Sequence, residues 1–164
     1  MSFYPYAAYN ISTVYPSDWR VELNPKSDNF EGDVVFHSPK GDKIYISWGK
    51  LEKAKERFED LEEHTKVSIE RLRKTRDVVN MNVLDKRDGS IYGHRAILSQ
   101  IEISTAIPTF SLFGSKRTDK RLVLSAHFYC EQSERYVVLY SLSRESEENI
   151  EPLFREVAQN LKCH

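Results

Sequence analysis

The sequence predicts an α+β fold, a three-layer α/β/α sandwich around a central, mainly antiparallel sheet. Several strand-like runs are joined by short turns, which is typical of antiparallel pairs. Two amphipathic helical segments occur, one in the first half of the chain and one at its end. Residues 136–142 are apolar at nearly every position, which favours a strand covered on both faces and therefore helices on both sides of the sheet.

The first part of the chain predicts an extended arm followed by three strands. Residues 1–9 form the arm, which is rich in tyrosine. Residues 17–23 alternate between apolar and polar side chains, as expected for a strand with one buried face. Residues 33–38 and 43–48 form a predicted hairpin, because the intervening residues 39–42, Pro-Lys-Gly-Asp, suit a tight turn.

The apolar period changes to three and four residues over residues 51–76, which predicts one long amphipathic helix. Acidic residues crowd its first half and basic residues its end, as the helix dipole favours. His64 follows Asp60 by four residues, the spacing of a metal pair or of a simple hydrogen-bonded pair. Because the pattern supplies no third or fourth ligand, we expect a surface pair.

The second half predicts two more hairpins. Residues 78–104 suggest two strands around a turn at residues 87–89, because Asp-Gly between alternating runs is a strong hairpin cue. Residues 121–131 and 134–143 form the last predicted hairpin.

The end of the chain predicts helical structure with an acidic start. Ser143 or Ser146 can cap it. Pro152 is tolerated only in a first turn, so we expect a short helical turn to Ile150 and then the main helix to about Lys162.

The bulk composition indicates one domain covering residues 1–164, with a formal net charge of −1 that gives no global reason to expect nucleic-acid binding. No apolar run reaches the ~20 residues of a membrane span. The start of the chain lacks the basic and apolar regions of a secretory signal, so a cytoplasmic location is expected. Cys130 and Cys163 lack metal-type spacing and are expected to be free thiols.

The sequence carries no recognisable catalytic motif, and we expect no catalytic residue, no metal and no cofactor. His127 and Cys130 are three apart in a predicted strand, so their side chains should emerge on opposite faces. They are interpreted as a polar-face histidine and a core cysteine. His37, His94 and His164 are scattered along the chain.

Four strings together resemble the PsbP family: "YPSDW" at residues 15–19, "FHSPKGDKIYIS" at 36–47, "IYGHRAI" at 91–97 and the run at 136–161. That family includes the extrinsic photosystem subunit and a nuclear-import factor that binds the GTPase Ran. The resemblance extends from about Tyr9 to Leu161. It implies the fold, and it implies that the scaffold commonly works by binding another protein. No functional residue of the family can be matched here.

The connection at residues 107–117, "IPTFSLFGSKR", is unusually apolar for a link between two strands. It could fold back as a flap, extend its flanking strands into a hairpin that dimerises, or stay exposed as a docking site. The residues that we take as candidates for partner binding are Ile107, Phe110, Leu112, Phe113, Lys116 and Arg117.

The functional hypothesis is a non-catalytic module that binds another protein, or a second copy of itself, through a surface that includes residues 105–120. The alternative is a small-molecule or lipid carrier, or an enzyme, with a pocket between sheet and helix near Trp19, Tyr45 and Trp48.

Overall fold

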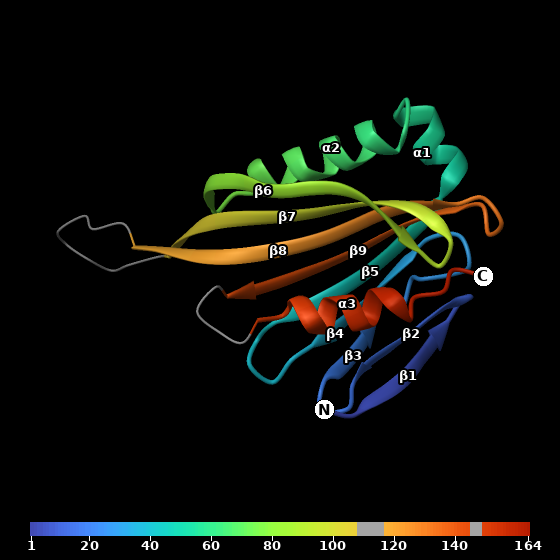
Figure 1. Cartoon of the computed structure of the whole chain (residues 1–164), viewed down its shortest axis with the longest axis horizontal. Helices are drawn as coiled ribbons and strands as arrows, with labels where there is room; N and C mark the ends of the chain where they lie inside the picture. Colours follow the sequence, from blue (N-terminus) through green and yellow to red (C-terminus); the bar gives the residue numbers. More distant parts are fainter. Residues whose placement is uncertain (108–116, 145–148) are drawn as a thin grey trace.

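The computed structural model describes residues 1–107, 117–144 and 149–164 (Figure 1). Within these residues, seven antiparallel strands form one sheet in the order β3-β4-β5-β9-β8-β7-β6. These strands are β3 (Arg20–Leu23), β4 (Gly32–His37), β5 (Lys43–Lys50), β6 (Val78–Ile91), β7 (His94–Ile107), β8 (Arg117–Cys130) and β9 (Arg135–Arg144).

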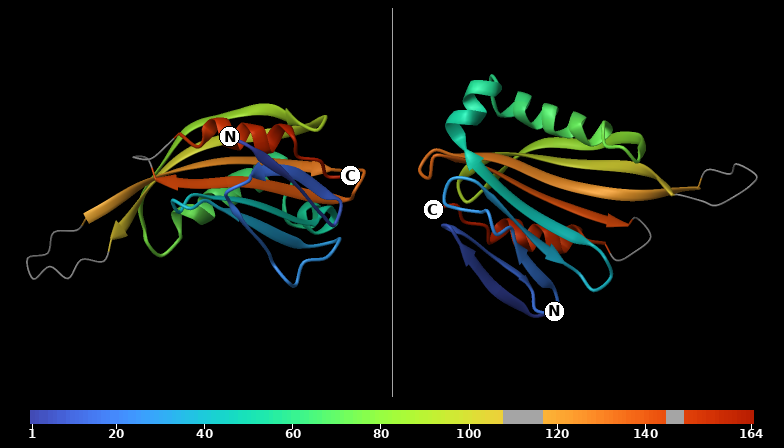
Figure 2. Two further views of the ribbon diagram at one scale, coloured as in Figure 1. Left: turned by 90° about the horizontal axis from the view of Figure 1, so that it is seen from below. Right: turned by 180° about the vertical axis from the view of Figure 1, so that it is seen from behind.

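The two faces of this sheet carry different elements (Figures 1 and 2). Helices α1 (Leu51–Arg57) and α2 (Leu61–Arg73) lie over one face. Helix α3 (Glu151–Gln159) lies over the other, beside a separate hairpin of β1 (Phe3–Ala8) and β2 (Ile11–Pro16). The prediction of an α+β fold with a mainly antiparallel sheet is confirmed. The expected N-terminal arm is instead a hairpin.

Strand β9 is the fourth of the seven strands and is covered on both faces, as its apolar sequence predicted. Val137 and Leu139 belong to the buried cluster on the α3 side, together with Phe154. Tyr140 faces α2 and stacks on Tyr45 of β5, with ring centroids 4.4 Å apart. Burying one such side chain contributes about 1.5–3 kcal/mol, so the two-sided packing of β9 anchors the sheet.

The expected single helix at residues 51–76 is wrong, because the chain breaks between α1 and α2. Phe58 has extended backbone angles, and α2 starts anew after Asp60. The Asp60 carboxylate accepts a hydrogen bond from the Glu63 backbone N–H at 2.8 Å, while the Glu63 carboxylate accepts one from the Glu59 N–H at 2.5 Å. This reciprocal arrangement resembles a capping box, which satisfies N–H groups that a helix start leaves free.

The turn predicted at residues 87–89 is also wrong, because β6 continues to Ile91 and the hairpin turns at Tyr92 and Gly93. Both turn residues have positive φ, 49° and 77°, as a two-residue type I′ turn requires. Gly89 lies inside the strand, where a Cβ atom would come 2.7 Å from Leu98 Cδ1. The glycine at this position therefore makes room for Leu98 and does not form a turn.

The final helix is shorter than expected. Helix α3 begins at Glu151 with Pro152 in its first turn and ends at Gln159, three residues before the expected end at Lys162. The expected cap Ser143 lies in β9, and Ser146 and most of the expected preliminary turn lie outside the described residues. Lys162 instead pairs with Ser12 of β2 through two backbone hydrogen bonds.

Candidate functional site

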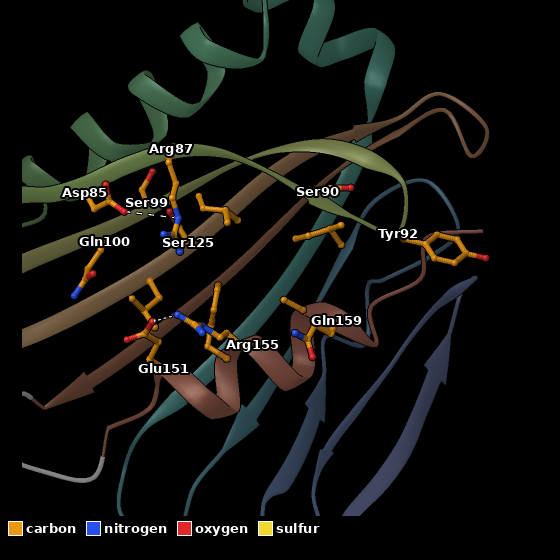
Figure 3. Close-up of a pocket in the computed structure, with 15 residues that line it drawn as sticks. Asp85, Arg87, Ser90, Tyr92, Ser99, Gln100, Ser125, Glu151, Arg155 and Gln159 are labelled. Carbon is orange, nitrogen blue, oxygen red and sulfur yellow. Dashed lines mark hydrogen bonds and ion pairs between the residues drawn. The ribbon is translucent and has the colours of Figure 1, made fainter.

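A groove of about 480 Å³ lies between α3 and the part of the sheet formed by β6, β7 and β8 (Figure 3). It exists because α3 packs over β9 and beside β2, which leaves that end of the sheet less covered. Strand alternation turns Leu98 of β7 and Leu124 of β8 toward α3, where Phe154 and Ala158 face them. The groove therefore has an apolar base.

Charged side chains from both walls border this base (Figure 3). On the β6 wall, Arg87 Nε lies 3.8 Å from Asp85 Oδ2, which is too long for a direct hydrogen bond. On the α3 wall, the Arg155 guanidinium donates to Glu151 Oε1 at 2.6 Å. An apolar base between two arginines can bind an apolar side chain next to a carboxylate. Sequence reasoning missed this site, since its walls come together only in the fold.

The predicted recognition residues are only partly described. Ile107 ends β7, is 42% exposed and lies opposite Arg117, the first residue of β8. The two strands have fourteen residues each and project beyond the rest of the sheet (Figure 1). Phe110, Leu112, Phe113 and Lys116 lie outside the described residues. The strands thus stay paired up to both ends of the connection.

Two histidines predicted at polar positions, one on α2 and one on β8, are instead buried between α2 and the sheet. His64 Nδ1 lies 3.1 Å from the Tyr129 hydroxyl, so the expected surface pair with Asp60 is wrong. His127 is 3% exposed, and neither of its ring nitrogens has a hydrogen-bond partner in the part of the chain that the structure describes. Burial lowers the pKa of His64 to about 4 and that of His127 to about 3. Arg71 and Arg57 contribute less to the shift of His64, and His64 and Lys86 contribute less to that of His127. Both imidazoles are therefore neutral at pH 7.

The aromatic residues of the alternative hypothesis do not line one shared cavity. Trp48 packs in the core on the α3 side and donates its indole N–H to the Asp28 carbonyl at 2.9 Å. Trp19 packs against the same core cluster. Tyr45 lies on the opposite face against Tyr140. Core packing accounts for these three rings.

Four side chains that looked scattered in the sequence meet at one end of the sheet: His94, Cys130, Cys163 and His164. Their potential ligand atoms all lie within 4.8 Å of one another, and both cysteines are buried free thiols. Burial and the neighbouring Cys130 raise the pKa of Cys163 to about 12, while burial and His164 lower the pKa of His94. Cys130 and His127 emerge on opposite faces of β8, as predicted.

Comparison with known proteins identifies the fold. No protein-family model and no curated protein sequence matches the chain. The solution structure of cyanobacterial PsbP (CyanoP) from Synechocystis sp. PCC 6803 has a TM-score of 0.69 at 11% identity, covering 99% of this chain and 93% of that one. The Saccharomyces cerevisiae Ran-binding protein Mog1p has a TM-score of 0.64 at 11% identity, covering 99% and 96%.

A third structure, a protein of unknown function from Pseudomonas aeruginosa described as a putative regulator, has a TM-score of 0.52 at 11% identity, covering 96% of this chain and 94% of that one. The chain is thus an α+β protein with a PsbP/Mog1-like fold, which confirms the resemblance seen in the sequence. Likeness at this identity defines the fold alone. Among the described residues, no helix is long and apolar enough to cross a membrane.

Proposed function

We propose that the protein is a non-catalytic module that binds another protein, acting in the cytoplasm as a single domain over residues 1–164. In this proposal the three layers of an α/β/α sandwich form a rigid scaffold, and the groove beside α3 is the main recognition surface. The observation that carries the proposal is the combination of an apolar base with an arginine on each wall. Aromatic and arginine side chains are enriched at protein interfaces, where apolar anchors enter pockets.

The proposed occupant is an extended segment of a partner with one large apolar side chain next to a carboxylate. The apolar side chain would contact Leu98, Leu124 and Phe154. The carboxylate would pair with Arg87, because the existing contact between Arg87 and Asp85 is weak, at 3.8 Å. Arg155 already has a close carboxylate partner in Glu151, at 2.6 Å.

We further propose that the connection between β7 and β8 extends this surface, through Ile107, Phe110, Leu112, Phe113, Lys116 and Arg117. Ile107 is exposed, although it is a large aliphatic residue. Apolar side chains beside basic ones suit contact with a partner protein or with a second copy of this chain. A homodimer formed through the connection is the second arrangement that this proposal allows.

Peptides selected from a random display library on the immobilised full-length protein test the proposal. We expect the selected peptides to carry a large apolar residue beside Asp or Glu. Fluorescence anisotropy should show at least about tenfold weaker binding to the double variant Arg87→Glu/Arg155→Glu, since two attractive charges become repulsive. The double variant Phe110→Ser/Phe113→Ser should also bind more weakly and should lose any self-association seen by sedimentation.

Arg73→Glu/Arg76→Glu is the matched control, because it makes the same charge change at the last residue of α2 and three residues beyond it, on the opposite face. Its affinity for the peptides should stay within about twofold of wild type. Equal binding by the wild type and the groove variant would overturn the groove as the recognition surface. Unchanged binding and self-association in the phenylalanine variant would remove the connection from it.

The second candidate function is small-molecule binding in a cavity of about 370 Å³ between α2 and the sheet. The specific observation in its favour is His127, which lines this cavity and whose two buried ring nitrogens have no partner among the residues that the structure describes. A metabolite that bonds them would raise the melting temperature in a thermal-shift screen at pH 7, and His127→Leu should abolish the rise. A broad library without a hit that depends on His127 would argue against this function.

A further inference from the structure

The cluster of His94, Cys130, Cys163 and His164 has the composition of a metal centre. Thiolates and imidazoles are the ligands that zinc prefers, and two of each make one of the usual closed sites. The four residues come from three separate places in the fold: the start of β7, the end of β8 and the segment after α3. The end of that segment lies near the β6–β7 turn in Figure 1.

Distances within the cluster suit tetrahedral coordination. His164 Nδ1 lies 3.4 Å from Cys130 Sγ and 3.5 Å from Cys163 Sγ. In a tetrahedral zinc site with usual bond lengths, a sulfur and a nitrogen ligand lie roughly 3.5 Å apart and two sulfurs roughly 3.8 Å apart. Because all four ligand atoms lie within 4.8 Å of one another, binding requires no pair to close by more than about 1.5 Å.

The surroundings of the cluster also fit a metal centre. His94 Nε2 is buried without a hydrogen-bond partner in the described parts of the chain, although buried polar atoms normally have one. The Phe128 ring lies nearly parallel to the His94 ring, with centroids 5.9 Å apart, and the Tyr92 ring lies 4.7 Å from that of His164. The Arg135 guanidinium donates to the Cys163 carbonyl at 2.8 Å, which fixes the backbone of one ligand.

We propose that His94, Cys130, Cys163 and His164 bind one Zn²⁺ ion in a closed, tetrahedral, structural site. With four protein ligands, no coordination position remains for substrate, so the ion would stabilise the fold and not catalyse a reaction. It would link the segment after α3 to the start of β7 and the end of β8. This inference stands independently of the proposed binding function.

Metal content and cobalt spectroscopy test the site. Protein produced in zinc-supplemented medium should contain about one zinc per chain by mass spectrometry of the metal. Titration of the reduced, metal-free protein with Co²⁺ should give thiolate-to-cobalt charge-transfer bands and the intense visible bands of a tetrahedral site. Chelation should lower the melting temperature, and Zn²⁺ but not Mg²⁺ should restore it.

His164→Ala is the most informative variant, because His164 is exposed and its removal should leave the fold intact, as circular dichroism can check. We expect at least about tenfold weaker Co²⁺ binding, given that even residues behind the ligands cost about 10–100-fold. Cys163→Ser should lose one thiolate from the spectrum. His37→Ala, which removes a histidine of β4 that lies beside Glu22 and outside the cluster, is the control and should bind the metal as wild type does.

Three results would overturn the zinc site. The first is reduced wild-type protein that gives no cobalt spectrum and contains no zinc. The second is His164→Ala with unchanged metal affinity. The third is a Cys130–Cys163 disulfide in protein isolated under non-oxidising conditions, which would leave no thiolate to bind the metal.

Discussion

Replacing Arg135 by Met is expected to lower the free energy of unfolding by about 3–6 kcal/mol. Arg135 is 3% exposed, and its guanidinium donates to four backbone carbonyls. The closest are those of Tyr9 at 2.6 Å and Cys163 at 2.8 Å; those of Asn10 and Asn29 both lie at 3.3 Å. A hydrogen bond to a charged group contributes about 1.5–3 kcal/mol, and the two close bonds alone account for the expected loss.

The position of Arg135 explains why the loss should be large. Tyr9 and Asn10 form the β1–β2 turn, where both residues have positive φ, 51° and 59°. Cys163 lies after α3. Arg135 therefore joins the N-terminal hairpin to the segment after the last helix, and methionine would leave buried carbonyls without donors. Lysine should recover little of the loss, because one ammonium cannot replace the planar fork of a guanidinium.

Urea unfolding of Arg135→Met and Arg95→Met provides the measurement. Arg95 contacts two carboxylates, those of Glu62 and Asp88, but it lies on the surface. Exposed ion pairs contribute about 0–1 kcal/mol, so the control should lose no more than that. Similar losses in the two variants would show that the buried carbonyl contacts of Arg135 do not hold the hairpin in place.

Strand periodicity predicted the sheet well because alternation reports burial directly. The apolar run at residues 136–142 is the central strand β9, and residues 33–38 and 43–48 form the β4–β5 hairpin.

The position of the β6–β7 turn was predicted wrongly because two dipeptides in this region both favour a turn. Asp88-Gly89 and Tyr92-Gly93 both suit turns, and the packing of Leu98 over Gly89 favours the second. Asp60 followed three residues later by Glu63 is a capping pattern, and it marks the start of α2. The apolar period of three and four residues continues across this break, so the sequence favoured one long helix.

The candidate sites were less predictable because they depend on contacts between distant parts of the chain. The β7–β8 register pairs Ala96 with Phe128, and two more residues along each strand would place His94 opposite Cys130. Half of the Cys/His cluster could therefore be found from a hairpin alone. Cys163 and His164 join the cluster only because α3 packs across the sheet. The spacing of these residues in the sequence does not predict that packing.

Lowering the pH from 7 to 5 is expected to remove about 4 kcal/mol of stability through His64 and His127. An unfolded histidine titrates near 6.5, whereas these two titrate at about 4 and about 3 in the fold. Between those values the unfolded chain binds more protons than the folded chain, so stability rises with pH and is lost as the pH falls. The linkage amounts to about 2 kcal/mol per histidine over this range.

His127→Leu separates this effect from ordinary acid unfolding. The variant should be at least as stable as wild type at pH 7, because an apolar side chain replaces a buried imidazole that has no hydrogen-bond partner within residues 1–107, 117–144 and 149–164. It should lose about 2 kcal/mol less stability than wild type between pH 7 and 5, since the contribution of His127 is removed. Ser125→Ala is the control: it removes another buried polar group that has no partner in the described part of the chain, but one that does not titrate in this range.

Urea unfolding at several pH values, in the presence of a chelator, measures these differences. Wild type and Ser125→Ala should show the same pH dependence, and His127→Leu a shallower one. If His127→Leu keeps the full acid loss, the lowered pKa of His127 is contradicted. If it is destabilised at pH 7, the expected cost of burying this imidazole is contradicted. If it is stabilised, stability gives no reason for a histidine at this position, and the cavity under α2 becomes the place to look for a ligand.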